Sequence, residues 1–282
     1  MSLDRQPLRN NTETTDGKTT ICVVNYRTLD LTRLCLRSLR KFTDGPYEIL
    51  VVDNDSQDAS QEYLRSLSWI RLIERHPPRP DPNGSFAHGA ALDLGLANCR
   101  TEFFVSLHSD TVILQEGWLS YLVQHFAGDP QVACVGTGKI ELKPAWQQWL
   151  TKNTNLKALV RTLLAGPEKK LRFRYFNTTI CSAYRTDVLR RENLSFHACQ
   201  DRRLTVGREL YFALQARGYQ TIALPPQSVG QYVAHLAHAT QALHGRHLAI
   251  GGGATRKYRR RAAKVLRLET VQALLSDSRL DE

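Results

Sequence analysis

The sequence predicts an α/β fold in which a mainly parallel β-sheet is flanked by helices. Two features of residues 20–140 carry this prediction: short apolar runs alternate with segments of helical periodicity, and polar residues follow several of the apolar runs directly. Parallel neighbours need a crossover connection, usually a helix, so this alternation predicts βαβ units. The chain of 282 residues, 42% hydrophobic and 23% charged, has the length and composition of an ordinary globular protein built around one large domain.

The first half of the chain repeats one order of elements. A strand at Thr20–Val24 is followed by a helix over Leu29–Phe42, where apolar residues recur at spacings of three and four. His76–Ser85 contains four prolines and a glycine, so we expect a loop there. The other expected strands are Glu48–Val52, Trp69–Ile73 and Phe103–Leu107, and the other helices are Asp58–Leu67 and a small-residue segment marked by Ala87, Ala90, Ala91, Leu94 and Ala97.

Beyond Lys139 the order is less regular. We expect helices at Ala145–Leu164, Gly207–Arg217 and Thr255–Leu275, and strands at Thr178–Tyr184 and Tyr219–Leu224. No linker rich in Gly, Ser or Pro separates the two halves, which indicates subdomains of one unit. The expected division is a disordered leader (1–19), an α/β subdomain (20–140), a second subdomain (141–250) and a basic C-terminal helix (251–282).

The net charge of +11 favours partners that carry phosphate, such as nucleotides or anionic lipid. Nucleic acid is not an expected partner, because the sequence lacks zinc-ligand spacing, an aromatic RNA-binding motif and a recognition helix. Neither an apolar signal core nor a membrane-spanning stretch is evident, so we expect a cytoplasmic protein. The six cysteines show no paired spacing and are expected to be buried, reduced thiols.

Polar residues follow three of the expected strands. These residues are Asn25-Tyr26, Asp53-Asn54-Asp55-Ser56 and His108-Ser109-Asp110-Thr111. Ligands of open parallel sheets bind beyond the carboxyl ends of the strands, where such residues converge. Any one of these groups could instead start a turn or cap a helix. Three groups together favour a shared binding cleft.

At these positions the sequence resembles the glycosyltransferases of the GT-A fold, specifically the inverting, nucleotide-sugar-dependent family 2. Four segments carry the resemblance: VVNYRTLDLTRLCLRSL (Val23–Leu39), YEILVVDNDSQDAS (Tyr47–Ser60), NGSFAHGAALDLGLA (Asn83–Ala97) and FFVSLHSDTVILQEGWL (Phe103–Leu119). A looser match follows at Arg208–Pro226. The resemblance implies that residues 20–140 bind the nucleotide sugar and that residues 141–250 form the acceptor-side, catalytic subdomain.

The resemblance also implies a donor site with a divalent cation. Tyr26 and Asp53 would form the nucleotide pocket, with Asn25 and Asn54 beside them. Asn83-Gly84 and His108-Ser109-Asp110 would also line the donor site. Asp110 resembles the last residue of the family's Asp-x-Asp motif, which ligates Mn²⁺ or Mg²⁺ on the donor diphosphate.

This chain departs from that motif, because His108 stands at its first position, with Ser109 between His108 and Asp110. A neutral imidazole can still ligate Mn²⁺ or hydrogen-bond to a metal-bound water. In the alternative, a cation-independent site, basic residues of Lys169–Arg174 would neutralise the leaving diphosphate.

The family's catalytic base is an acid at the start of the helix that precedes a Gly-aromatic strand. Glu209 is the first candidate for this base and Asp201 the second, although a helix-start acid such as Glu209 can also simply interact with the helix dipole. The resemblance further implies a late histidine near the diphosphate or metal. His235 or His238 would fill that place, and the alternative for each is a structural, hydrogen-bonded histidine.

The implied reaction transfers a sugar to an acceptor hydroxyl with inversion, in polysaccharide or glycoconjugate synthesis. The acceptor would be a saccharide or a lipid-linked molecule. The basic C-terminal helix favours either contact with an anionic membrane surface, which would make the protein peripheral on the inner face of the membrane, or an ordinary solvated face. The alternative function is a catalytically degenerate GT-A fold that acts as a nucleotide-sugar binding or assembly module.

Overall fold

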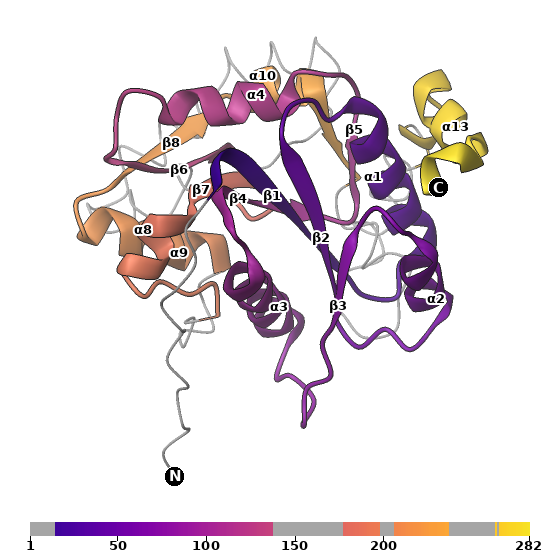
Figure 1. The fold of residues 1–282 in the computed structure, drawn as a ribbon, viewed down its shortest axis with the longest axis horizontal. Helices are drawn as coiled ribbons and strands as arrows, with labels where there is room; N and C mark the ends of the chain where they lie inside the picture. Colours follow the sequence, from indigo (N-terminus) through magenta and orange to yellow (C-terminus); the bar gives the residue numbers. More distant parts are fainter. Residues whose placement is uncertain (1–14, 138–176, 198–205, 237–262, 264) are drawn as a thin grey trace, which may run out of the picture.

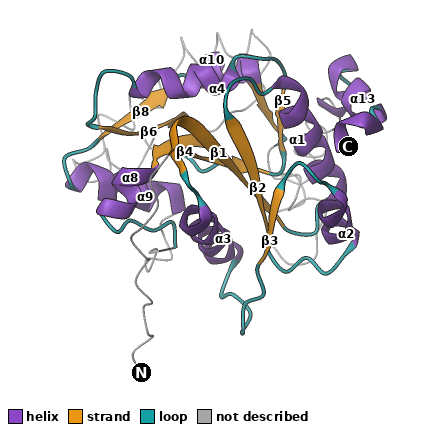
Figure 2. Ribbon diagram, viewed as in Figure 1, coloured by secondary structure: helices purple, strands orange, loops and turns teal. Residues whose placement is uncertain are grey.

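The computed structural model describes residues 15–137, 177–197, 206–236, 263 and 265–282, and in this part of the chain a central sheet is covered by helices on both faces (Figures 1 and 2). The main sheet has seven strands in the order β3-β2-β1-β4-β7-β6-β8. Only β7 runs antiparallel to its neighbours, so the prediction of a mainly parallel α/β sheet is confirmed. The strands are β1 (Thr15–Asn25), β2 (Tyr47–Asp53), β3 (Arg71–Glu74), β4 (Thr101–His108), β6 (Val132–Thr137), β7 (Cys181–Arg185) and β8 (Gln220–Leu224).

A small antiparallel ribbon adds two short strands beside the main sheet. β5 (Thr111–Ile113) follows β4 after a two-residue turn, and β9 (Val233–His235) pairs with it. The ribbon therefore joins two segments that are far apart in the sequence. The sequence did not predict either strand, because three residues are too few to show a periodicity.

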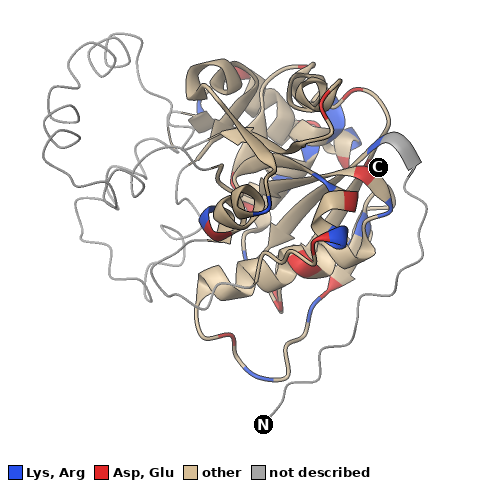
Figure 3. Cartoon of the chain, turned by 90° about the vertical axis from the view of Figure 1, so that its left-hand side faces the viewer, with Lys and Arg blue, Asp and Glu red and all other residues tan. Residues whose placement is uncertain are grey.

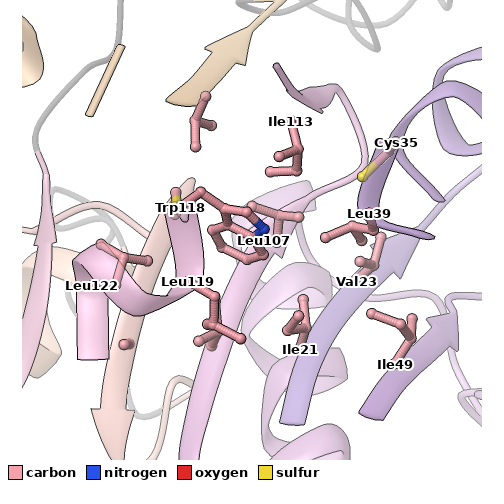
Figure 4. Packing of buried hydrophobic residues seen from close by; sticks show 14 of the residues in the cluster. Ile21, Val23, Cys35, Leu39, Ile49, Leu107, Ile113, Trp118, Leu119 and Leu122 are labelled. Carbon is pink, nitrogen blue, oxygen red and sulfur yellow. The ribbon is translucent and has the colours of Figure 1, made fainter. Parts of the chain in front are cut away.

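The helices cover the sheet in two layers. The described helices are α1 (Leu29–Phe42), α2 (Ala59–Ser66), α3 (Gly84–Asn98), α4 (Trp118–Val123), α8 (Thr186–Arg191), α9 (Val206–Ala216), α10 (Pro226–Tyr232) and α13 (Glu269–Ser276), with 3₁₀ turns η1 (Gln124–Phe126) and η2 (Ser278–Asp281). Successive residues of a strand point to opposite faces. In β1, Ile21 and Val23 accordingly pack in the cluster that contains α1, α2, α4 and α10, while Cys22 and Val24 pack with α3, α8 and α9. Figure 4 shows the first cluster around Trp118, which is 1% exposed.

Strand register places the predicted site residues at one edge of the sheet. Asn25 is level with Asp53, and Val24 is level with His108. Because β1, β2 and β4 are parallel, their carboxyl ends all point to this edge. The polar residues that follow the three strands therefore start from the same side of the molecule, as expected.

The C-terminal segment differs from the single helix expected over Thr255–Leu275. Leu268 is extended, with φ −65° and ψ 136°, and α13 starts after it. At about 100° per residue, a straight helix would turn Val265 roughly 120° to 180° away from Val271 and Leu274. All three are buried in one cluster with residues of α1. The break therefore lets both sides of the bend pack against the same helix.

The end of the chain is fastened to α1 by polar contacts. Arg37, 5% exposed, donates to both carboxylate oxygens of Asp281 at 2.8 and 2.5 Å and to the carbonyl oxygens of Leu274 and Leu275. The Tyr63 hydroxyl also donates to Asp281, at 2.8 Å. We call this set, Arg37, Tyr63 and Asp281, the C-terminal clasp.

Several expectations fall on residues outside the described chain. They are the leader before Thr15, the helix at Ala145–Leu164, the basic run Lys169–Arg174 and most of the basic C-terminal segment before Val265. The described residues carry 18 Lys or Arg against 22 Asp or Glu, so the positive excess of the sequence lies in the remaining segments. Both signs of charge are spread over the described ribbon in Figure 3. No helix in the described part is both long and apolar enough to cross a membrane.

Candidate active site

Asn25 is the centre of a buried hydrogen-bond network at the ends of β1 and β2. Its side-chain amide donates to Asp53 Oδ1 at 2.7 Å, to Ser56 Oγ at 3.0 Å and to Ser60 Oγ at 2.9 Å. Its side-chain oxygen, Oδ1, accepts from the Thr32 hydroxyl at 2.7 Å. Asn25 is 0% exposed. The network, which we call the Asn25 hub, thus fixes the loops after both strands.

Asp53, expected to bind the nucleotide, lies within this hub. It is 0% exposed, and both of its carboxylate oxygens accept hydrogen bonds from Ser56, from the hydroxyl at 2.6 Å and from the backbone N–H at 3.1 Å. The neighbouring Asn54 accepts from Arg75 Nη1 at 2.6 Å. Tyr26, by contrast, is 44% exposed at the rim of this edge. Of these two predicted nucleotide-binding residues, Tyr26 is therefore exposed, whereas Asp53 is buried and holds the loop after β2 in place.

The Asn83-Gly84 pair starts α3. Asn83 is the N-cap, and its side-chain oxygen accepts from the Phe86 N–H at 2.9 Å. A Cβ on Gly84 would have no described atom within 4 Å, so packing in the described chain does not require glycine there. The role of this pair in donor binding stays a prediction.

Asp110 lies where β4, β5 and β9 meet. It occupies the turn between β4 and β5, is 4% exposed, and its backbone oxygen accepts from the Leu236 N–H at 2.9 Å. Thr111 pairs with His235 across the ribbon. This pairing places His235 Nε2 at 3.0 Å from Asp110 Oδ1. His108, at the end of β4, has its Nδ1 at 3.8 Å from the same oxygen. The structure therefore brings His108, Asp110 and His235 together, whereas His238 lies outside the described residues.

The histidines control the charge of Asp110. Burial by itself raises the pKa of the Asp110 carboxyl, but the adjacent His235, and more weakly His108, outweigh burial and hold this pKa well below its ordinary value. Asp110 is therefore a carboxylate throughout the neutral pH range. A buried anion of this kind needs a cation or a donor beside it.

His108 is held between two other side chains. Its Nε2 lies 3.2 Å from the Thr179 hydroxyl, on the opposite side of the ring from Asp110. His88 of α3 packs edge-on against it, with the ring centroids 4.8 Å apart. Burial lowers the pKa of His88 to about 4, against the opposing charge of Asp110, so His88 is neutral at pH 7. These contacts fix the plane of the His108 ring.

Glu209 belongs to the first turn of α9, whose start packs close to the same region. A Cβ on Gly207 would lie 2.7 Å from the Asn177 backbone oxygen and 3.2 Å from the Thr179 nitrogen, so only glycine allows this approach. Thr179 in turn contacts His108. Glu209 Oε2 is buried and has no hydrogen-bond partner among the described residues. Asp201, the second candidate base, lies outside them.

Asp93 of α3 accepts three hydrogen bonds from residues 195–197, which follow α8. Its carboxylate accepts from the Ser195 hydroxyl at 2.5 Å and from the backbone N–H groups of Phe196 and His197 at 2.7 and 3.0 Å. Burial raises the pKa of Asp93, and these three hydrogen bonds oppose that rise. Asp93 thus holds residues 195–197 against α3.

The cluster of His108, Asp110 and His235 fits a divalent cation. One ligand atom from each residue lies within 4.8 Å of the other two. His235 Nε2 is buried and, despite its ion-pair contact with Asp110, has no aligned hydrogen-bond partner in the described part of the chain. A histidine nitrogen and a carboxylate oxygen that face one another in this way are both of the kinds that ligate a divalent cation.

Two residues that contact His108, His88 and Thr179, could not be recognised from the sequence motifs. We gave His88 no role from the sequence, and Thr179 was only part of an expected strand. One physical clue was available for His88: α3 starts at the carboxyl edge, so its first two turns must lie near the end of a neighbouring strand. Thr179 lies just before β7, whose reversed direction the sequence did not predict.

Comparisons with known proteins agree with the fold. The sequence model of Glycosyl transferase family 2 matches residues 20–194. No match was found among curated proteins. Among solved structures, the mannosyltransferase PcManGT from Pyrobaculum calidifontis, in complex with GDP-Man and Mn²⁺, has a TM-score of 0.54 at 17% identity, over 96% of this chain and 77% of that one.

Two further solved structures have the same fold. Glucosyl-3-phosphoglycerate synthase from Mycobacterium tuberculosis, in complex with Mn²⁺, UDP-glucose and phosphoglyceric acid, has a TM-score of 0.51 at 17% identity, covering 88% of this chain and 79% of that one. TarS from S. aureus has a TM-score of 0.50 at 14% identity, covering 88% and 71%. At these identities the likeness shows the fold alone. Since the family model matches more than half of the sequence, the chain belongs to glycosyl transferase family 2.

Proposed function

We propose that this chain transfers a hexosyl group from a nucleoside-diphosphate sugar to an acceptor hydroxyl, with inversion at the anomeric carbon. The observation that carries the proposal is the buried Asp110 carboxylate, which meets two imidazoles at the carboxyl edge of the sheet. Open α/β sheets bind their ligands at this edge. The solved structures above, in complex with GDP-Man or UDP-glucose and Mn²⁺, support the same class of donor.

Each part of the edge has a role in this proposal. Tyr26 and the loop held by Asp53 receive the nucleotide, with Asn25, Asn54 and the Asn83-Gly84 turn around it. Asp110 and His235, with His108, hold Mn²⁺ or Mg²⁺. When bound, such a cation neutralises negative charge that develops on the leaving diphosphate.

Glu209 is the proposed base. In the reaction the acceptor oxygen forms a bond to the anomeric carbon, the bond from that carbon to the diphosphate breaks, and the acceptor proton passes to a carboxylate. Glu209 is suited to this task because one of its oxygens is buried and has no hydrogen-bond partner in the described residues. Asp201 is the alternative.

The acceptor is proposed to be a saccharide or a lipid-linked molecule. The basic residues of the sequence between Thr255 and Leu268 support contact with an anionic membrane surface, on the inner face of which the protein would work in polysaccharide or glycoconjugate synthesis. Co-sedimentation of the full-length chain with vesicles, with and without anionic lipid, tests this contact. Equal amounts of protein in both pellets would contradict it.

A second function is favoured by one observation, the imidazole of His108 where the family motif has a carboxylate. In this alternative the chain binds a nucleotide sugar without transferring it. Donor binding with neither transfer nor hydrolysis, across UDP-, GDP- and dTDP-sugars, would support the alternative. Turnover of any of these donors would reject it.

Glu209→Gln tests the proposed reaction. The substitution keeps the shape of the side chain but removes the base, so we expect transfer to fall by about 100-fold or more while donor binding is retained. Glu116→Gln is the matched control, because Glu116 is exposed in the loop before α4. Transfer is measured by release of the nucleoside diphosphate, and binding by thermal shift. A near-normal rate for Glu209→Gln would assign the base to another residue.

A further inference from the structure

The side chains around Asp110 form an unusual set of donors for a cation on a sugar diphosphate. The described cluster offers two imidazoles and one carboxylate: His108, His235 and Asp110. Mg²⁺ prefers oxygen ligands, whereas imidazole nitrogen suits the later first-row transition metals. The chemistry of this cluster therefore bears on which metal it takes, and not only on whether it takes one.

The contacts of His108 orient its Nδ1 toward Asp110. The Thr179 hydroxyl, on a residue that is 8% exposed, lies 3.2 Å from His108 Nε2. When Nε2 carries the proton and donates it to Thr179 Oγ1, Nδ1 presents a lone pair on the side of Asp110. A hydrogen bond to the far ring nitrogen is the usual way in which proteins fix a metal-binding histidine. The edge-on contact with His88 restrains the ring in the same plane.

His235 completes the set from the other side. It comes from β9, is 9% exposed, and its Nε2 lies 3.0 Å from Asp110 Oδ1. The backbone around it is fixed, because β9 pairs with β5 and the Leu236 N–H donates to the Asp110 carbonyl. The two imidazoles thus approach one carboxylate from different strands, each on a rigid element.

We propose that His108, positioned by Thr179, is a nitrogen ligand, and that the His108–Asp110–His235 set binds a first-row transition-metal dication in preference to Mg²⁺. The inference deepens the metal role of Asp110 given under the proposed function. It does not depend on sugar transfer, because it concerns the binding of the metal alone.

The first experiment measures metal affinity of the full-length, EDTA-treated protein. Mn²⁺ is titrated and followed by the EPR signal of the free ion, and Co²⁺ and Mg²⁺ are measured by competition, each with and without UDP. We expect binding to strengthen in the order Mg²⁺, Mn²⁺, Co²⁺, with Co²⁺ at least about tenfold tighter than Mg²⁺. Equal affinity for Mg²⁺ and Co²⁺ in both conditions would overturn the proposal.

Substitution at His108 separates this residue from the other two. His108→Asp replaces the nitrogen by oxygen, so the ratio of Co²⁺ to Mg²⁺ affinity should fall by about tenfold or more. His125→Gln is the matched control, since His125 lies on η1 against Tyr121 and outside the cluster. An unchanged affinity ratio in His108→Asp would show that His108 is not a ligand.

A spectroscopic count of nitrogen ligands needs no stable variant. Pulsed EPR of the native Mn²⁺ complex should show couplings to two imidazole nitrogens, and coupling to only one would overturn the role of His108. Thr179→Val should weaken Mn²⁺ binding by about tenfold through loss of the hydrogen bond to Nε2. Loss of transfer with these metal signatures intact would count against the proposed function and leave this proposal standing.

Discussion

Two polar regions lie at the same edge of the sheet and differ in how their side chains are satisfied. In the Asn25 hub, the amide and both Asp53 oxygens are hydrogen-bonded to protein groups. In the cluster at Asp110, His235 Nε2 is buried without an aligned partner in the described chain. His88 Nε2 is in the same situation. Among the described residues, the polar groups of the first region are hydrogen-bonded to one another, whereas the second contains buried imidazole nitrogens without an aligned partner.

This difference indicates that the two regions have different roles, one in stability and one in the proposed reaction. Burial of a polar atom without a hydrogen bond costs roughly 1 to 3 kcal/mol, so such atoms are rare in folded proteins. The Asn25 hub avoids this cost and stabilises the two loops that present the site. In the Asp110 cluster, the proposed cation and diphosphate would offset this free-energy cost. The hub should therefore govern stability, and the cluster should govern activity.

The largest expected effect is on stability, from Asn25→Ala. The substitution removes the amide that donates to Asp53, Ser56 and Ser60 and the oxygen that accepts from Thr32, and it leaves a cavity at a fully buried position. We therefore expect the free energy of unfolding to fall by about 4 kcal/mol. Urea denaturation followed by circular dichroism measures this change. A loss below about 1 kcal/mol would mean that the hub is not the scaffold of this edge.

Asp110→Asn is the opposite test. We expect transfer to fall by more than about 100-fold, since even the outer partners of metal ligands contribute about 10- to 100-fold. The variant should unfold cooperatively, but added Mn²⁺ should no longer raise its Tm as it does for the native chain. A variant that keeps the Mn²⁺-induced rise in Tm would place the cation elsewhere.

Much of the fold could be predicted from the sequence, and the reason lies in particular elements. The helix at Leu29–Phe42 has the bounds expected from its apolar spacing, and each of β1, β2 and β4 contains its expected apolar run. Local patterns of this kind are properties of neighbouring residues. Asp110, and His235 or His238, were predicted as site residues by resemblance to a family and not by periodicity, and their roles stay predictions.

The remaining features depend on contacts that are distant in the sequence. The break at Leu268 exists because Val265 and Val271 both pack against α1, and no local signal distinguishes it from a continuous basic helix. The reversed strand β7 brings Thr179 to His108, and α3 brings His88 to the same ring. Short strands such as β5 and β9 form only because they pair with each other.

The C-terminal clasp extends the comparison to a third polar region, whose side chains are hydrogen-bonded to one another and which includes none of the candidate site residues. Asp281→Ala leaves the buried guanidinium of Arg37 without its carboxylate, so we expect a loss of about 2 kcal/mol of stability at pH 7. Transfer should be unchanged at temperatures where the variant is folded. A rate loss in the folded variant would show that the clasp acts on the site as well.

The clasp also has a predictable pH dependence. Burial acts to raise the pKa of Asp281, but the hydrogen bonds from Arg37 and Tyr63 outweigh it and hold this pKa below its ordinary value. A carboxyl whose pKa is lower in the folded state stabilises the protein above its unfolded pKa of about 3.9. That contribution is lost as the pH falls through the folded value. The stability difference between native and Asp281→Ala chains should therefore be constant from pH 7 to about 5 and shrink below about pH 4.

The smallest expected effect on stability is that of Gly84→Ala, which tests the proposed place of Asn83-Gly84 in the donor site. The new Cβ meets no described atom within 4 Å, and Gly84 is the first residue of α3. Replacing glycine in a helix by alanine restricts the unfolded chain, so stability should rise by up to about 1 kcal/mol. If the donor approaches this backbone as proposed, the KM for the nucleotide sugar should nevertheless increase. A stabilised variant with an unchanged KM would remove Gly84 from the donor site and leave it as the start of a helix that Asn83 caps.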